Sequence, residues 1–269
     1  MPPRAERSEP DSMRKLSAIV TTYNEIRHIR EVLESMRFAD ELIVVDSGSD
    51  DGTVEAARGI ADEILYRQYD SPAKQKNWAI PQAKHDWILI LDADERVTPE
   101  LQKEVEQVLS RDEIQEDGFW IYRDNIFLGK RVRYGGRQRD KVIRLIRKNL
   151  RYHNVQVHEE IDGSRHRIGK LKAKLDHDSA ADLDHYIDKQ NRYARWAAGE
   201  LYKKGLKPNL WHFWVKPAFR FMKQFVFQLG FLDGKAGYLA SRIDAQTVYN
   251  RFVELRRLHA EDQHRETQV

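Results

Sequence analysis

The chain has 269 residues, of which 41% are hydrophobic and 33% are charged, and its net charge is +3. This length fits one large domain or one domain with an appendage, and the composition excludes a disordered chain. The absence of cysteine excludes disulfides and thiolate chemistry and is consistent with a reducing, cytoplasmic compartment. No apolar run reaches the roughly 18 residues of a transmembrane helix. Residues 1–13 are polar, include three prolines, and are predicted to be a disordered leader.

Strand and helix patterns alternate through about residue 110. Short apolar runs predict strands over residues 16–21, 41–46, 63–66 and 86–91. Helices are predicted over residues 26–36, 53–61 and 74–83, and a further helix begins after Thr98 with Pro99 at its first position. This alternation predicts an α/β fold of Rossmann type, with a mostly parallel sheet and helices on both faces.

The pattern changes after Gly118. Strands are predicted over residues 119–122, 142–146 and 155–157. An amphipathic helix is predicted over residues 182–204, with an apolar face formed by Leu183, Ile187, Gln190, Tyr193 or Ala194, Ala197 and Leu201. Residues 201–258 contain 11 Lys and Arg against 3 Asp and Glu, together with 12 aromatic residues. We therefore expect an α/β region over residues 14–204 and a basic, aromatic, helical C-terminal region over residues 205–269.

Polar clusters follow three of the predicted strands. They are Thr22–Glu25, Asp46–Asp51 and Asp92–Asp94. Ligands of open α/β sheets bind outside the carboxyl ends of the strands, and all three clusters follow strands at that end. The sequence therefore predicts that they converge on one edge of the sheet.

Asp92 and Asp94 are spaced so that both carboxylates lie on the same side of the chain at a strand end. A hard divalent cation would relieve their repulsion, and a nucleotide diphosphate would supply further oxygen ligands. A solvated loop with acids near a helix start is the alternative. The position of the pair directly after the apolar run 87–91 favours the cation site.

The other two clusters allow two interpretations each. Asp46 could accept hydrogen bonds from a uracil ring or a ribose hydroxyl, or it could cap the helix predicted to begin near Thr53. In the first cluster, Asn24 is a reasonable N-cap residue, so this segment is equally ambiguous.

An acid and a histidine further along the chain are additional candidates. Glu159 follows the predicted strand 155–157 and could act as the general base toward an acceptor hydroxyl, with Glu160 as the alternate. A charged strand end is the other interpretation. His177 could be a third metal ligand, although a solvent-exposed histidine at the entry to the helix 182–204 is the simpler local expectation.

Three segments together resemble the nucleotide-binding half of glycosyltransferase family 2. They are Ser17–Glu25, Ile43–Thr53 and Asp86–Glu95, in this order and spacing. Val157–Glu159 and Gly230–Gly237 are similar to the branch that contains bacterial lipopolysaccharide core glucosyltransferases. With these, the resemblance extends over most of residues 16–245, with lower specificity beyond residue 110.

The resemblance implies a GT-A fold, with residues 14–115 as the nucleotide-binding half and 116–204 as the acceptor half. It also implies an inverting enzyme that transfers a hexose, glucose in this branch, from a UDP-sugar to a hydroxyl of a glycan or glycolipid, in lipopolysaccharide core or cell-envelope glycan synthesis. Matched by position, the nucleoside would be held by Thr22, Glu25 and Asp46, and Lys76 and Asn77 would lie near the donor. Asp92 and Asp94 would form the Asp-x-Asp motif that holds Mg²⁺ or Mn²⁺, with Asp94 closest to the metal. Glu159 falls where this branch places its base, although many members carry Glu-Asp there and this chain has Glu159-Glu160.

The basic, aromatic C-terminal region admits three interpretations: contact with an anionic membrane surface at the inner face of the cytoplasmic membrane, contact with phosphates of the acceptor, or packing on the catalytic domain.

Two rival functions remain open. A sugar-nucleotide nucleotidyltransferase would need a glycine- and arginine-rich loop after the first strand, where this chain has Thr21–Glu25. A nucleic-acid or membrane binding module would leave the three acidic clusters unexplained, and nucleic acid is not expected as a partner.

Overall fold

The computed structural model describes residues 13–153, 161, 166–180 and 182–267. These residues form two compact units. The first unit contains residues 13–122, 141–153, 161 and 166–175, and the second contains residues 123–140, 176–180 and 182–267. The predicted leader lies almost wholly outside the described residues, as do Glu159, Glu160 and the strand predicted over residues 155–157.

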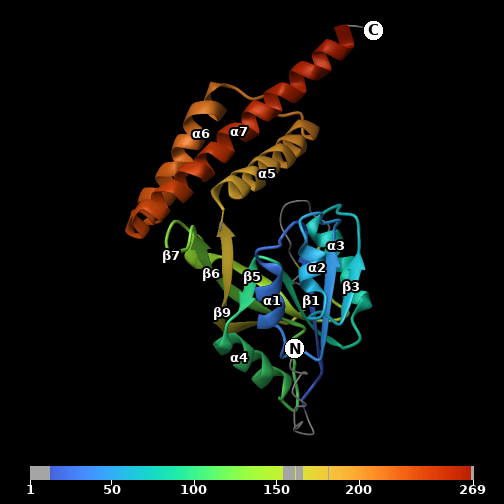
Figure 1. Cartoon of the computed structure of the whole chain (residues 1–269). Coiled ribbons are helices and arrows are strands. Elements are labelled where there is room, and N and C mark those ends of the chain that lie inside the picture. The colour runs from blue at the N-terminus through green and yellow to red at the C-terminus, as the bar shows by residue number, and fades with distance from the viewer. Residues whose placement is uncertain (1–12, 154–160, 162–165, 181, 268–269) are drawn as a thin grey trace. The chain divides into compact units, whose positions relative to one another are not determined.

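The first unit alternates strands and helices as the sequence predicts (Figure 1). Its elements are β1 (Leu16–Thr22), α1 (Ile29–Ser35), β2 (Glu41–Asp46), α2 (Thr53–Ala57), β3 (Glu63–Tyr66), α3 (Pro72–Ala79), η1 (Ile80–Gln82), β4 (Trp87–Asp92), β5 (Glu95–Val97) and α4 (Pro99–Leu109). The predicted start of α4 is confirmed, because the Thr98 hydroxyl accepts a hydrogen bond from the Leu101 amide at 3.2 Å.

The described residues form a mixed sheet in the order β3-β2-β1-β4-β8-β6-β9-β5, with β7 paired to β6. The later strands are β6 (Gly118–Phe127), β7 (Lys130–Val132), β8 (Lys141–Arg147) and β9 (Ile168–Ala180). Strands β3, β2, β1 and β4 are parallel, whereas β8 is antiparallel to β4 and to β6. The parallel half matches the prediction, while β5, β7 and β9 were not predicted.

Both faces of the parallel half are buried, which explains why its strands are almost continuously apolar. Alternate residues point to opposite faces. Leu89 of β4 therefore belongs to one core cluster with residues of α1 and α4. Ile88 and Ile90 belong to a second cluster with residues of α3. This packing fixes the strand ends that carry the polar clusters.

The second unit is mainly helical, as predicted for the C-terminal region. A short η2 (Arg137–Arg139) precedes the helices α5 (Leu183–Lys203), α6 (Leu210–Met222), η3 (Lys223–Phe227), η4 (Gly230–Asp233) and α7 (Gly234–Thr267). The segment η3 is a π-helical turn, and Pro217 lies inside α6. Helices α5 and α6 both pack on α7. No helix among the described residues is long and apolar enough to cross a membrane.

The predicted apolar face of the helix 182–204 is only partly correct. Tyr186, Ala194 and Ala198 are buried, whereas Leu183 and Ile187 are exposed. The two alanines present little bulk, which allows α7 to pack closely, with Phe252 and Leu255 of α7 in the same buried cluster as Ala198. The buried side of the helix is therefore rotated relative to the predicted face, toward Tyr186, Ala194 and Ala198.

Candidate functional site

The three polar clusters of the first unit lie at one edge of the parallel sheet. In the strand register Thr22 is opposite Asp46, and Thr21 is opposite Asp92. The last residues of β2, β1 and β4 are therefore direct neighbours at their carboxyl ends. This confirms the predicted convergence, and we call these strand ends and the loops that follow them the rim.

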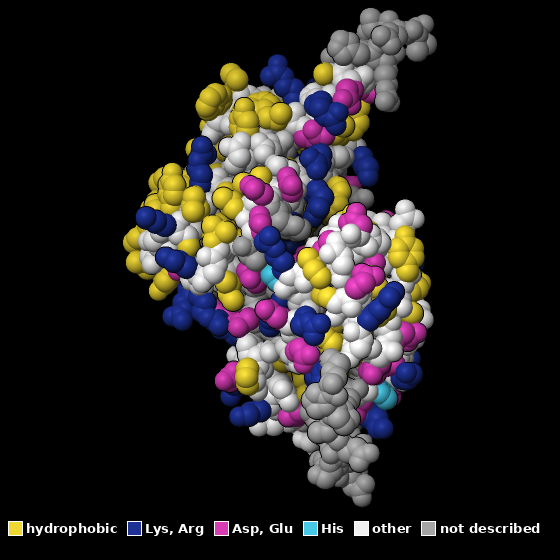
Figure 2. All heavy atoms as spheres, viewed as in Figure 1, with side chains coloured by type: hydrophobic (Ala, Val, Ile, Leu, Met, Phe, Trp, Pro, Cys, Tyr) yellow, Lys and Arg dark blue, Asp and Glu magenta, His cyan; other side chains and the backbone are white. Residues whose placement is uncertain are grey.

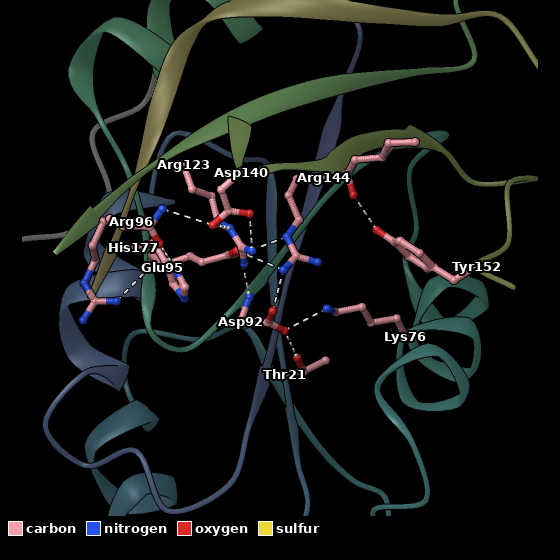
Figure 3. A network of polar contacts seen from close by, with 12 residues as sticks. Thr21, Lys76, Asp92, Glu95, Arg96, Arg123, Asp140, Arg144, Tyr152 and His177 are labelled. Atoms are coloured by element: carbon pink, nitrogen blue, oxygen red, sulfur yellow. Dashed lines mark hydrogen bonds and ion pairs between the residues drawn. The ribbon is translucent and has the colours of Figure 1, made fainter. Parts of the chain in front are cut away.

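Asp92 is surrounded by hydrogen-bond donors and cations (Figure 3). One of its carboxylate oxygens, Oδ1, is 2.8 Å from Lys76 Nζ and accepts a hydrogen bond from the Thr21 hydroxyl at 3.1 Å. The other, Oδ2, accepts from the guanidinium of Arg144. Lys76 and Arg144 are both almost completely buried, each 1% exposed. The Asp92 carboxylate is thus held by two buried cations.

Arg144 also forms two hydrogen bonds to Glu95, each 2.9 Å long, and Glu95 is completely buried. Glu95 in turn accepts a hydrogen bond from the Asp92 backbone amide at 3.1 Å. Arg144 and Glu95 therefore fix the backbone turn that carries Asp92 and Asp94. The sequence analysis missed both residues, although a single arginine inside the apolar strand β8 is a recognisable signal, because a buried arginine is nearly always paired.

The electrostatics of this turn favour an ionised Asp92 carboxylate. Burial alone would raise the pKa of Asp92, but Arg144 and then Lys76 outweigh burial and hold this pKa well below its usual range. The charge of Asp94 acts in the opposite direction, so the two carboxylates interact electrostatically. Asp94 is 7% exposed, whereas the side chain of Asp92 is 35% exposed. Asp92 is thus held as a partly exposed carboxylate beside the largely buried Asp94.

Asp46 organises the loop that follows β2. Its Oδ2 atom accepts hydrogen bonds from the backbone amides of Gly48 at 2.7 Å and Ser49 at 3.0 Å. The role of capping the turn at Thr53 belongs instead to Asp51, which accepts the Thr53 amide at 3.0 Å. The predicted alternative that Asp46 caps this helix is therefore wrong, because its carboxylate is used two and three residues further along the chain.

The loops after β1 and β2 are joined by side chains. The Asn24 side chain exchanges two hydrogen bonds with Asp50, through its Nδ2 at 2.9 Å and its Oδ1 at 3.0 Å. The Glu25 amide donates to the Thr53 hydroxyl at 2.8 Å, and the Glu25 carboxylate is 4.0 Å from His28 Nε2. Asn24 therefore links two loops rather than capping a helix, and α1 begins later, at Ile29.

Thr22 carries a buried hydroxyl at the centre of the rim. The residue is 4% exposed, and its Oγ1 atom has no hydrogen-bond partner among the described residues. Buried hydroxyls are normally paired, and an exception calls for an explanation. A ligand that donates to or accepts from this hydroxyl is one such explanation.

Asn77 holds the chain just before the segment that carries the predicted base. Its side-chain amide donates to the Tyr152 carbonyl at 2.8 Å, and its Oδ1 accepts from the Tyr152 amide at 2.8 Å. Tyr152 also forms an antiparallel bridge with Ile161. The two residues that bracket the segment with Glu159 and Glu160 are thereby fixed to the first unit.

His177 lies in β9, within the second unit, and not at a helix entry in solvent as the simpler expectation had it. Its ring is partly buried, and its Nδ1 atom is 2.7 Å from Asn125 Oδ1. The correction follows from the unpredicted strand β9, which extends to Ala180. Within the described parts of the chain, no three His, Asp or Glu side chains are grouped so as to hold a metal ion by themselves.

Comparison with known proteins assigns the family. Residues 17–164, which include the rim, match the model of glycosyl transferase family 2. The chain belongs to this family. It is therefore a glycosyltransferase, which decides against a nucleotidyltransferase and against a module that only binds.

Relatives of similar length support the assignment. A protein from Rickettsia bellii described as an uncharacterized glycosyltransferase is 29% identical over 259 residues, covering 91% of this chain and 87% of the relative. The lipopolysaccharide core biosynthesis glycosyltransferase LpsC from Rhizobium meliloti is 25% identical over 265 residues, covering 92% and 96%. Among solved structures, the mannosyltransferase PcManGT from Pyrobaculum calidifontis, in complex with GDP-Man and Mn²⁺, is 15% identical with a TM-score of 0.52, covering 92% of this chain and 88% of its own. This last similarity establishes the GT-A fold.

Proposed function

We propose that this glycosyltransferase transfers a hexose, glucose in the first instance, from a UDP-sugar to a hydroxyl of a glycan or glycolipid acceptor, with inversion at the anomeric carbon. The observation that carries the proposal is the rim, where Asp92 is held by two buried cations, Asp94 is largely buried two residues on, and the neighbouring strand end carries the unpartnered hydroxyl of Thr22. The similarity to LpsC supports a role in lipopolysaccharide core or other cell-envelope glycan synthesis.

The donor set at the rim fits a divalent cation shared with a diphosphate. By its position in the Asp-x-Asp motif, Asp94 is the proposed metal contact. Asp92, whose oxygens are held by Thr21, Lys76 and Arg144, is proposed to position the turn. A bound Mg²⁺ or Mn²⁺ would neutralise charge that develops on the diphosphate leaving group. A contribution of His177 to the metal stays a prediction.

The remaining rim residues would bind and orient the donor. Thr22, with its buried hydroxyl, and Glu25 and Asp46 on the two joined loops are the proposed contacts to the nucleoside. Lys76, whose Nζ atom lies 2.8 Å from Asp92 Oδ1, is the proposed contact to the diphosphate. Asn77 acts on the donor side only indirectly, because both ends of its amide hold Tyr152.

Glu159 is the proposed general base, with Glu160 as the alternate. An acceptor hydroxyl must lose its proton as it attacks the anomeric carbon, and a carboxylate within hydrogen-bond reach takes that proton. The hydrogen bonds of Asn77 to Tyr152 and the bridge between Tyr152 and Ile161 anchor the chain on both sides of this segment.

The test is calorimetric binding of UDP-, GDP- and dTDP-sugars with and without Mn²⁺, combined with single-turnover transfer assays. We expect a UDP-sugar to bind best and only with metal, and Asp94→Ala to abolish both metal-dependent binding and transfer. Glu159→Gln should abolish transfer and retain donor binding, while Glu160→Gln, the matched control, should retain both. Loss of donor binding in Glu159→Gln would show that this residue is not the base, and tighter binding of GDP-sugars would replace the proposed donor.

A further inference from the structure

The second unit exposes an unusual number of large apolar side chains between the start of α6 and the start of α7. Six of them define what we call the apolar face, and Figure 2 shows hydrophobic side chains gathered over this part of the molecule. Its residues are Trp211, Trp214, Phe219, Phe227, Phe231 and Leu232. Trp214 is 71% exposed and Phe227 is 70% exposed, which is close to the exposure of a surface lysine and far from that of a core residue. Contiguous patches of this kind mark sites of interaction.

Packing on α7 accounts for only some of the aromatic residues of α6. Phe213 and Phe221 form edge-to-face ring contacts with Tyr249 and Tyr238 of α7 and are partly buried. Trp211, Trp214 and Phe219 are exposed. Helix α6 therefore carries more aromatic surface than its packing on α7 uses.

The backbone of the exposed residues after α6 is held by close packing and hydrogen bonds. Gly230 and Gly237 allow η4 and the first turns of α7 to touch, since a Cβ atom on Gly237 would lie 1.9 Å from the Gly230 carbonyl oxygen. Asp233 accepts hydrogen bonds from the backbone amides of Arg133 at 3.1 Å and Tyr134 at 2.8 Å. Gln224 donates to Asp244 at 2.6 Å. Phe227, Phe231 and Leu232 are thus presented outward by a packed structure.

The charges around the apolar face are nearly all positive. Residues 205–239 contain five Lys and Arg and one acid, Asp233. That acid is already engaged with backbone amides, whereas Lys223 and Lys235 are exposed. Lys216 lies over the ring of Phe252 on α7, at 5.1 Å, and is not counted with them. A bare aromatic face bordered by lysines matches an interface that has an apolar interior and anionic headgroups at its surface.

We propose that the apolar face lies in the interfacial layer of an anionic lipid bilayer, with its aromatic side chains among the acyl chains and the lysines on the lipid phosphates. A spanning arrangement does not fit the described helices, none of which is long and apolar enough. Each lysine near such a surface is attracted to the lipid phosphates, and the tryptophans add affinity by burial of apolar area. The proposal goes beyond the proposed function and does not depend on the donor or the base.

The test is co-sedimentation of the full chain with vesicles of phosphatidylcholine alone and of phosphatidylcholine mixed with phosphatidylglycerol. The wild-type protein should bind the mixed vesicles at least tenfold more tightly, with a blue shift of tryptophan fluorescence, and salt should weaken binding. The double variant Trp214→Ser/Phe227→Ser should lose binding to both kinds of vesicle. Lys223→Glu/Lys235→Glu should lose only the preference for the anionic lipid.

Tyr66→Ser is the matched control, because Tyr66 is an equally exposed aromatic residue, at 67%, on β3 of the first unit. It should bind vesicles like the wild type, and circular dichroism should show every variant folded. The proposal is overturned if the wild type does not bind anionic vesicles, or if the aromatic double variant binds as well as the wild type. A dimer in sedimentation that the aromatic variant dissociates, without any change in lipid binding, would also overturn it. So would vesicle binding that only the lysine variant weakens and that soluble glycerol phosphate abolishes.

Discussion

At the rim of the first unit charged side chains are buried, whereas on α6 of the second unit large aromatic side chains are exposed. Water solvation alone would place both groups the other way round. At the rim the burial is compensated, because Arg144 pairs with Glu95 and Asp92. On the apolar face the described residues provide no cover over Trp214 or Phe227. We therefore expect the rim to bind a small polar ligand and the apolar face to bind a lipid surface.

The largest effect on stability should come from replacing Arg144, the buried cation of the rim. Arg144→Met leaves Glu95 buried without its partner, and breaking a buried pair in this way costs on the order of 3–5 kcal/mol of unfolding free energy. Urea denaturation measures this loss. Glu95→Met combined with Arg144→Met should recover part of it, because two apolar side chains replace the pair.

Arg257→Met is the surface control for that experiment. Arg257 pairs with Glu254 and Glu261 on α7, and its side chain is exposed. Solvent screens such pairs, so we expect no measurable change in the urea midpoint. An equal loss of stability in the two variants would mean that the ion pairs of the rim have no special structural weight.

The backbone that presents the apolar face gives the next largest effect. Gly237→Ala forces a Cβ atom to within 1.9 Å of the Gly230 carbonyl oxygen, and overpacking of this kind costs about 1–3 kcal/mol. Gly199→Ala in α5 is the matched control, since nothing lies within 4 Å of its Cβ position and alanine is the better helix former. Thermal unfolding should rank Gly199→Ala at or above the wild type and Gly237→Ala below it. The reverse order would show that the glycine contact does not hold η4 in place.

The parallel strands of the rim could be predicted from the sequence, whereas the residues that pair across the sheet could not. The strands β1, β2, β3 and β4 follow from short apolar runs, and their shared edge follows from parallel pairing. The pairing of Arg144 with Asp92 depends on β8 lying beside β4, with Leu145 opposite Leu89, and no local pattern reveals an antiparallel register over so many residues. Strand β9 alternates apolar and charged residues around Leu171 and Leu175, a signal that the sequence analysis did not use.

In the C-terminal unit the type of element could be predicted, but its packing could not. Composition predicted basic, aromatic helices correctly, but it could not tell which side of α6 would face α7. Phe213 and Trp214 are adjacent aromatic residues, yet one packs on α7 and the other is exposed. Only the packing on α7 separates these two roles.

A smaller effect concerns the pH dependence of the rim. The pKa of Asp92 is lowered in the folded protein, so its ion pairs stabilise the fold above the unfolded pKa of about 3.9 and are lost as pH falls toward the folded value. Asp92→Asn should therefore be less stable than the wild type at pH 7, and the difference should shrink as pH falls below about 4. Urea midpoints across this range measure it. A difference that grows as pH falls would reverse the assigned direction of the shift.

The smallest effect should be the most informative about function. The Thr22 hydroxyl is buried without a partner among the described residues, so Thr22→Val should leave the unfolding free energy within about 0.5 kcal/mol or raise it. If the hydroxyl binds the donor, affinity should fall by roughly 2- to 10-fold, as expected for one hydrogen bond of about 0.5–1.5 kcal/mol. Thr53→Val is the matched control, because the Thr53 hydroxyl accepts the Glu25 amide and donates to Asp51, so its loss should lower stability by about 1–3 kcal/mol. A Thr22→Val protein that is destabilised yet binds the donor normally would show that this hydroxyl is a structural group. The unpartnered hydroxyl would then no longer support ligand binding at the rim.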